Sequence, residues 1–273
     1  MKFCRLTIAT ALLILFASSL SHAFMKEGCG GGECTECHSL TRDEAATLLT
    51  GAVDDVISVE PSAVGGLWVV DIVKEGRKWP VYIDFSKRFL LSGQIIRLSD
   101  KENVTENRFM RQNLVDVSSI PLENAVVIGD ANAKRRIIEF SDPDCHFCAK
   151  SHEEARKVVA KHPDIAFFVM LYSRTNNPRT VQKALSVLCG ETNAPKLLED
   201  AFHGRPLPEP TCRTSAVEEN ARLAAKLNIR GTPVTILPDG RMVNGFRDAE
   251  TILKLLNGKS PAAQTNQEQK ENP

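Results

Sequence analysis

The feature that most constrains the fold of this chain is a pair of cysteines, Cys145 and Cys148, that stands between a strand and a helix. Residues 136–140 are mostly apolar and are predicted to form a strand, and residues 148–161 are predicted to form a helix. Unpaired backbone N–H groups and the positive end of the helix dipole stabilise a thiolate at the start of a helix. Cys145 is therefore the predicted nucleophile, and Cys148, one turn further along, is the predicted resolving thiol.

Two thiols in this arrangement are suited to thiol–disulfide exchange. Attack of Cys145 on a substrate disulfide gives a mixed disulfide, and Cys148 breaks it by expelling the substrate thiol. His146 lies between the cysteines, where a positive imidazole stabilises the thiolate and makes the oxidised form easier to reduce. A structural disulfide and half of a zinc site are the competing interpretations. Zinc requires a second close pair of ligands, and none follows nearby, so no metal site is predicted here.

Thr232 and Pro233 stand just before a predicted strand. A cis peptide bond between them would place backbone groups beside the cysteines, where an extended substrate segment can pair with them. A proline before a strand is also often only a turn, so both alternatives are left open.

Glu139 is an acid in the middle of the otherwise apolar strand 136–140, six residues before Cys145. One interpretation is a strand residue that faces solvent. The other is a buried carboxylate that exchanges protons with Cys148 during resolution.

The start of the chain indicates export. A short basic region is followed by an apolar run and by small residues before a cleavage point after Ala23, which is typical of a signal peptide, and the apolar run is too short to span a bilayer. We therefore expect an exported protein. Basic and acidic residues are balanced at 34 each with no basic run, which argues against nucleic-acid binding.

The chain divides by composition and periodicity into six segments. They are a signal peptide at 1–23, a Cys- and Gly-rich leader at 24–40, a small domain at 41–98, a partly helical linker at 99–123, a larger domain at 124–258 and a polar tail at 259–273 that is predicted to be disordered.

The small domain combines one helix with an antiparallel sheet. A capping-box pattern starts the helix at Thr41, and the predicted strands cover 56–59, 67–73, 81–85 and 89–98. Such a thin α+β core usually needs a partner surface or a second copy of itself.

The larger domain alternates strands and helices. After the strand at 165–171, helices are predicted around 178–189, 194–202 and 215–227, then a hairpin over 234–246 and a last helix at 248–256. With a C-x-x-C pair between its first strand and helix, this order predicts an α/β, thioredoxin-like domain with inserted helices.

The motifs are more specific than the fold. Four features resemble the bacterial periplasmic protein-disulfide isomerases of the DsbC/DsbG type: residues 137–148, the cysteines Cys189 and Cys212, residues 229–234, and residues 238–240. The small domain resembles that family's N-terminal dimerisation domain, notably at 81–85 and 89–98.

The resemblance implies a periplasmic homodimer that reshuffles disulfides in misfolded or misoxidised exported proteins. Cys145 would attack, Cys148 would resolve, Thr232-Pro233 would be the cis-proline loop, and Cys189–Cys212 would be a structural disulfide. A membrane-embedded thiol reductant is implied as a partner, and no cofactor is required for the exchange.

Two positions depart from the family pattern. The dipeptide between the cysteines is His146-Phe147, and Glu139 occupies a place where the isomerases have an apolar residue. Both positions affect redox poise and resolution, so a net thiol oxidase or reductase that uses the same site is the alternative function.

The leader contains a second motif, C-x-x-C-H, at Cys34, Cys37 and His38. This is the attachment pattern of covalent haem c, which would make the chain a haem-carrying redox or chaperone protein. A disulfide or auxiliary redox pair among Cys29, Cys34 and Cys37, and a site for zinc or another metal, are the other interpretations. Eight cysteines, less Cys4 in the signal peptide, leave an odd number, so at least one is unpaired within the chain.

The intact mass of the mature protein separates these interpretations of the leader. Native and reduced, alkylated samples together count the disulfides, and covalent haem adds its own mass to both. A visible spectrum without a Soret band would contradict the haem interpretation.

Overall fold

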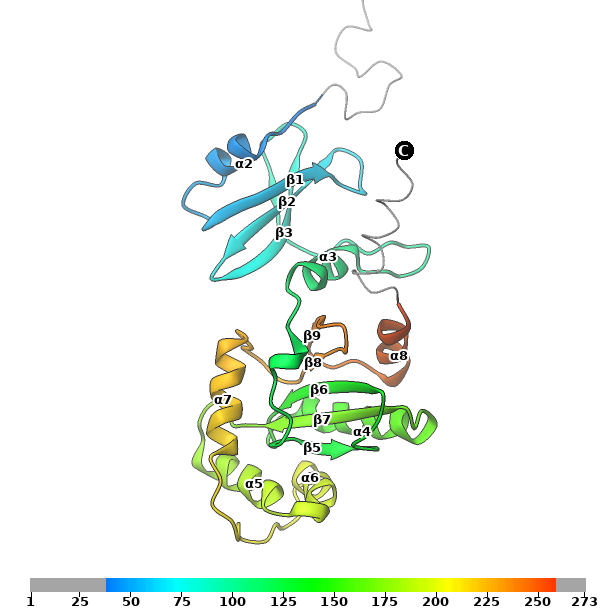
Figure 1. Cartoon of the computed structure of the whole chain (residues 1–273). Coiled ribbons are helices and arrows are strands. Elements are labelled where there is room, and N and C mark those ends of the chain that lie inside the picture. The colour runs from blue at the N-terminus through cyan, green and yellow to red at the C-terminus, as the bar shows by residue number, and fades with distance from the viewer. Residues whose placement is uncertain (1–37, 259–273) are drawn as a thin grey trace, which may run out of the picture. The chain divides into compact units, whose positions relative to one another are not determined.

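The structure is a computed structural model that describes residues 38–258. The chain forms two compact units that divide between Ile95 and Ile96, and each is described by itself (Figure 1). The predicted signal peptide at 1–23, most of the leader and the tail at 259–273 lie outside the described residues. Within residues 38–258, no helix is long and apolar enough to cross a membrane.

The first unit packs one helix against an antiparallel sheet, as the sequence predicts. The strands lie in the order β1-β2-β3-β4. The Thr41 hydroxyl caps the helix by accepting the Glu44 N–H at 3.2 Å. The elements are α2 (Arg42–Leu48), β1 (Asp55–Pro61), β2 (Leu67–Lys74), β3 (Arg77–Asp84) and β4 (Leu90–Leu91).

The predicted strand at 89–98 is wrong for most of its length. Only Leu90 and Leu91 form a ladder with β3, and beyond them the structure has just an isolated bridge between Ile96 and Asn103. Leu90 and Leu91 are 50% and 44% exposed. A longer ladder would bury little apolar area on this edge, so it would not repay the entropy of ordering the strand.

The second unit is a mixed five-stranded sheet in the order β5-β7-β6-β8-β9. Strands β6 and β7 are parallel, and the other neighbours are antiparallel. The elements are α3 (Val104–Gln112), η3 (Val117–Ser119), β5 (Val126–Ile128), β6 (Arg135–Ser141), α4 (His146–Lys161), β7 (Ile165–Leu171), α5 (Pro178–Leu188), η4 (Glu191–Asn193), α6 (Ala194–Phe202), α7 (Ala216–Lys226), β8 (Val234–Ile236), β9 (Met242–Asn244) and α8 (Ala249–Asn257).

Strand alternation divides the core of this unit into two layers. Ile137 of β6 packs in one cluster with Ala155 and Val158 of α4. Its neighbour Ile138 points to the opposite face and packs in a second cluster with Ala224 of α7. Because both faces of the sheet are covered, every residue of β7 is buried, which explains why that strand reads as a continuous apolar run.

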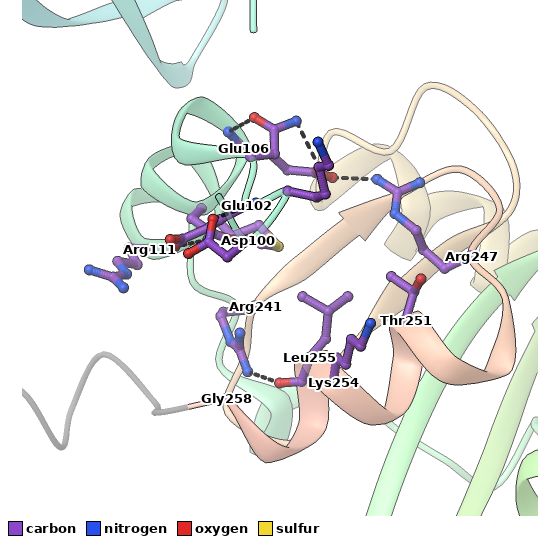
Figure 2. A pocket seen from close by; sticks show the side chains of 14 residues that line it. Asp100, Glu102, Glu106, Arg111, Arg241, Arg247, Thr251, Lys254, Leu255 and Gly258 are labelled. Atoms are coloured by element: carbon purple, nitrogen blue, oxygen red, sulfur yellow. Dashed lines mark hydrogen bonds and ion pairs between the residues drawn. The ribbon is translucent and has the colours of Figure 1, made fainter. Parts of the chain in front are cut away.

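The segment at 99–123 is partly helical, as the sequence predicts, and it packs on the second unit. Phe109 and Met110 of α3 lie in a buried cluster with Leu237 and Val243. Glu106 of the same helix forms an ion pair with Arg247, drawn in Figure 2. These contacts attach α3 to the β8–β9 end of the five-stranded sheet.

Gly240 forms the turn of the β8–β9 hairpin at φ +85°, and its carbonyl accepts the Val115 N–H at 2.8 Å. A Cβ at Gly240 would clash with the Val115 carbonyl oxygen. Gly240→Ala therefore combines left-handed backbone strain with a steric clash, and we expect it to lower the free energy of unfolding by at least about 2 kcal/mol in urea denaturation.

Gly204→Ala is the matched control for this substitution. Gly204 also has a positive φ, +66°, but a Cβ there meets nothing within 4 Å. Gly204→Ala therefore measures the cost of the left-handed backbone conformation alone, and we expect it to lower the free energy of unfolding by about 1 kcal/mol. Equal losses for the two variants would contradict the contact between Gly240 and Val115.

Candidate functional site

Cys145 occupies the N-cap position of α4, so the helix itself places the sulfur. Its Sγ accepts the Cys148 backbone N–H at 3.4 Å, and its thiol lies 3.4 Å from the Thr232 carbonyl oxygen, to which it can donate. The side chain is partly exposed. An incoming disulfide can therefore reach a sulfur that lies at a helix N-terminus, against a backbone N–H group of the first turn.

Cys148 lies one turn further into α4 and is fully buried. Burial raises the pKa of its thiol well above the ordinary value, with a smaller contribution from the neighbouring Cys145. Both thiols are free in this structure. Cys148 cannot meet a substrate from solvent, and it stays protonated until it reacts, which suits a thiol that attacks only from inside the site.

The loop between β6 and α4 is held by Asp142, a residue that the sequence reading did not single out. Its carboxylate oxygens accept the backbone N–H groups of Asp144 at 2.9 Å and Arg174 at 2.8 Å. Its carbonyl accepts the Cys145 N–H at 2.9 Å. The available signal was an aspartate just before a helix, a residue type whose side chain commonly bonds local backbone.

A peptide bond in the cis form joins Thr232 and Pro233. This confirms the first of the two alternatives that the sequence left open for this dipeptide. The bond places the Thr232 carbonyl against the Cys145 thiol, as the contact between them shows. Backbone groups of an extended peptide can pair with this loop next to the reactive sulfur.

An open pocket of about 480 Å³ adjoins Cys145. Its lining comes from the loop before α4, the loop after β7 and the cis-proline loop: Asp142, Asp144, Cys145, Arg174, Thr175, Asn177, Thr180, Gly231 and Thr232. A larger pocket of about 640 Å³ lies between α3 and α8 (Figure 2). It contains no cysteine, so we place the thiol chemistry in the smaller one.

The two residues between the cysteines face outward. His146 is exposed, and its ring lies against that of Phe147 with the centroids 5.6 Å apart. Phe147 is itself 54% exposed and has the Lys150 ammonium over its ring at 5.7 Å. An exposed aromatic ring two residues from Cys145 offers apolar contact to a bound protein. The effect of His146 on the thiolate stays a prediction.

Glu139 is 2% exposed, so the solvent-facing interpretation is wrong. The carboxyl group lies on the face of β6 that packs against α4, and its Oε2 accepts the Ser151 hydroxyl at 2.6 Å. Burial raises its pKa from 4.5 to about 7, and the hydrogen bond from Ser151 opposes that rise in part. The sequence could not decide the direction of this side chain, because both faces of β6 are apolar and buried.

The disulfide that the family resemblance implies is present. Cys189, the C-cap of α5, is bonded to Cys212 with their Cα atoms 5.4 Å apart. It ties the C-terminus of α5, the first inserted helix, to the loop before α7.

The leader motif is only partly described. Cys34 and Cys37 lie outside the described residues, as does Cys29. His38 is described, and its ring lies 5.0 Å from that of Phe85 in the first unit. Covalent haem at this motif stays a prediction.

Comparison with known proteins places the site in a family. The thioredoxin-like domain family matches residues 122–259. A probable thiol:disulfide interchange protein DsbC of Bordetella avium is 28% identical over 164 residues, which is 60% of this chain and 57% of that protein. DsbC of Dickeya dadantii is 24% identical over 72% of this chain and 79% of its own, and DsbC of Escherichia coli K12 is 22% identical over 78% and 87%.

Solved structures also align with part of the chain. A disulfide interchange protein of Neisseria gonorrhoeae has 24% identity and a TM-score of 0.43, covering 50% of this chain and 96% of its own. BdbD of Bacillus subtilis has 18% identity and a TM-score of 0.40, covering 50% and 92%.

The buried carboxyl group makes stability depend on pH. Between pH 4.5 and about 7 the folded chain keeps a proton on Glu139 that the unfolded chain has released, so the free energy of unfolding falls as the pH rises. The shift corresponds to about 3 kcal/mol, lost in full above the folded pKa. Glu139→Gln removes this titration, and its stability relative to the parent should therefore increase across that range.

Urea unfolding at about pH 4 and about pH 8, with the thiols reduced, measures this difference. Glu153→Gln is the control, because Glu153 is an exposed glutamate on α4 whose substitution should give no pH-dependent gain. A Glu139→Gln effect of equal size at both pH values would contradict a titrating carboxyl group at this position.

Proposed function

Because this chain belongs to the thioredoxin-like family, we propose that it is a periplasmic thiol–disulfide interchange enzyme that acts mainly as an isomerase or reductase of misoxidised exported proteins. The observation that carries the proposal is the pairing of an accessible sulfur at the N-cap of α4, Cys145, with a buried thiol one turn away, Cys148. The thiol–disulfide oxidoreductase chemistry predicted from the motifs agrees with the DsbC relatives.

The reaction begins when the Cys145 thiolate attacks a disulfide of the substrate. One substrate sulfur bonds to Cys145 and the other leaves as a thiolate, so the number of disulfides is unchanged. In isomerisation, the freed substrate thiolate attacks another substrate disulfide or the mixed disulfide itself. The Thr232-Pro233 loop supports this step by presenting backbone groups next to the sulfur.

Resolution by Cys148 gives net reduction of the substrate. The Cys148 sulfur bonds to Cys145, the bond from Cys145 to the substrate breaks, and the substrate sulfur leaves reduced. Cys148 must lose its proton in this step, and Glu139 is the proposed acceptor, because it is buried on the face of β6 that α4 covers. Its pKa of about 7 suits a base at neutral pH.

The first unit is the proposed homodimerisation domain. Its strand β4 lies at an edge of the sheet, and the apolar residues Phe89, Leu90 and Leu91 around it are 60%, 50% and 44% exposed. An edge strand with exposed apolar side chains is suited to pairing with a second copy. Light scattering is expected to give twice the protomer mass, and Leu91→Lys to shift the protein toward the monomer. A parent protein of protomer mass would contradict this assignment.

Redox partners follow from the direction of the reaction. An isomerase works with reduced cysteines in an oxidising compartment, so it requires a membrane-embedded thiol reductant. A net oxidase would instead be found with Cys145 and Cys148 joined in a disulfide. The buried Glu139 is the observation that supports this alternative. As the proposed proton acceptor of Cys148, it would raise the rate at which Cys148 forms the disulfide with Cys145.

Trapping of thiols in growing cells tests the direction of the reaction. We expect alkylation after acid quenching to label Cys145, because the reductant keeps it reduced. A mostly oxidised Cys145 would overturn the isomerase proposal and favour the oxidase.

Cys148→Ala tests the order of the two thiols. Without the resolving thiol, mixed disulfides at Cys145 should accumulate as higher-mass, reductant-sensitive species in non-reducing gels. Cys145→Ala is the control and should give no adduct at the active site, because the thiol of Cys148 is buried; peptide mapping distinguishes adducts at the leader cysteines. Adducts of equal yield in both variants would contradict the assignment of the nucleophile.

A further inference from the structure

A buried hydroxyl beside the reactive thiols has no assigned role. Ser141, the last residue of β6, is fully buried, and its Oγ has no hydrogen-bond partner among the residues that the structure describes. Buried hydroxyl groups are normally paired, because leaving one unpaired costs stability. Such an exception next to a reactive centre calls for a chemical explanation.

Strand and helix geometry place this hydroxyl between two reacting groups. Glu139 and Ser141 are two residues apart on β6, so their side chains share the face that packs against α4. Cys148 and Ser151 are three residues apart on α4 and share the helix face that meets them. The hydrogen bond from Ser151 to Glu139, at 2.6 Å, fixes how the strand and the helix meet.

The Ser141 hydroxyl lies on the face of β6 that carries Glu139 and packs against α4, the helix of Cys148. It lowers the pKa of the Glu139 carboxyl group and that of the Cys148 thiol, although burial dominates both values and raises them. It nevertheless completes a hydrogen bond with neither in this structure. A hydroxyl can accept a proton on one side and donate one on the other, so it is able to connect the two groups.

Other groups near Cys148 are less suited to take its proton. Burial, with the nearby Asp142 charge, raises the pKa of Tyr172 to about 12, so its phenol stays protonated. Each carboxylate oxygen of Asp142 already accepts a backbone N–H. Cys145 is the sulfur under attack and holds the substrate in this step.

We propose that Ser141 relays the proton of Cys148 to Glu139 during resolution, and that Ser151 is a positioning residue that holds the carboxyl group for the transfer. The inference rests on the proposed function and adds the proton route to it. Cys148 gives its proton to the Ser141 oxygen while the Ser141 hydroxyl gives its own proton to the Glu139 carboxylate.

The relay leaves atoms and electrons balanced. The Cys148 sulfur forms its bond to Cys145 as the bond from Cys145 to the substrate sulfur breaks. The Cys148 sulfur is oxidised as it enters the disulfide with Cys145, the substrate sulfur is reduced and leaves as a thiolate, and Glu139 ends protonated. When solvent returns that proton to the leaving thiolate, Glu139 is ready for another cycle.

An aromatic disulfide that releases a coloured thiolate tests the relay, because its reaction with the reduced enzyme has two visible phases. The first is attack by Cys145 and the second is resolution by Cys148. For Ser141→Ala we expect the first phase to be unchanged and the second to slow by at least about tenfold near neutral pH. The rise of the parent's second-phase rate with pH, centred near the Glu139 pKa of about 7, should be lost.

Further variants show whether the groups share one path. Glu139→Gln should slow the same phase, and the double variant should be no slower than the slower single variant. Ser186→Ala, which removes a buried hydroxyl on α5 outside the site, should change neither phase. Ser141→Ala is expected to keep its thermal stability, because the hydroxyl that it removes has no partner.

The outcomes distinguish failure of the proton relay from failure of the proposed thiol–disulfide exchange on which it rests. A second phase in Ser141→Ala with the parent's rate and pH profile would overturn the relay while the thiol chemistry stands, as would multiplicative slowing in the double variant. Equal slowing of both phases would also overturn it, because that result reports general damage. If the parent shows no first phase, the proposed function itself fails.

Discussion

The N-terminus of α4 is the constraint on which the site depends. A helix must satisfy its first backbone N–H groups, and in this chain the Cys145 sulfur takes the capping position that an oxygen usually fills. The Cys145 sulfur is therefore positioned by the backbone of the first helical turn. The same helix sets the position of Cys148. This residue lies one turn further along α4, where the helix is already covered by the rest of the domain, so its thiol is buried.

Strand β6 contributes two buried polar side chains to the site, and burying them lowers the stability of the fold. β6 is covered on both faces, and a strand in that position normally carries only apolar side chains. This chain places a carboxyl group and an unpaired hydroxyl there, at Glu139 and Ser141. Both lie on the side of the sheet that α4 and Cys148 cover, so these two exceptions to an apolar core gather beside the cysteines, where we propose that a proton moves.

Two differences between sequence and structure have the same physical origin. Glu139 breaks an apolar run, which is the pattern of a solvent-facing position, yet the residue is buried because helices cover both sides of its strand. Residues 89–98 are apolar enough for a strand, yet only β4 forms, because no neighbouring element covers that edge within the first unit. In each case the outcome depends on whether another element of the fold packs against that face or edge of the strand. The periodicity of one segment carries no information about such packing.

The sequence by itself determined that two cysteines stand at the start of α4, the order of strands and helices in the second unit, and the family. These depend on local spacing: two cysteines at a helix start, and apolar residues at strand and helix periods. It also placed Thr232-Pro233 before a strand. Only the tertiary structure decided that Glu139 and Ser141 face Cys148, and that Asp142 anchors the loop to the residues after β7. Those relations join segments far apart in the chain, so they exist only once α4 has packed against the sheet.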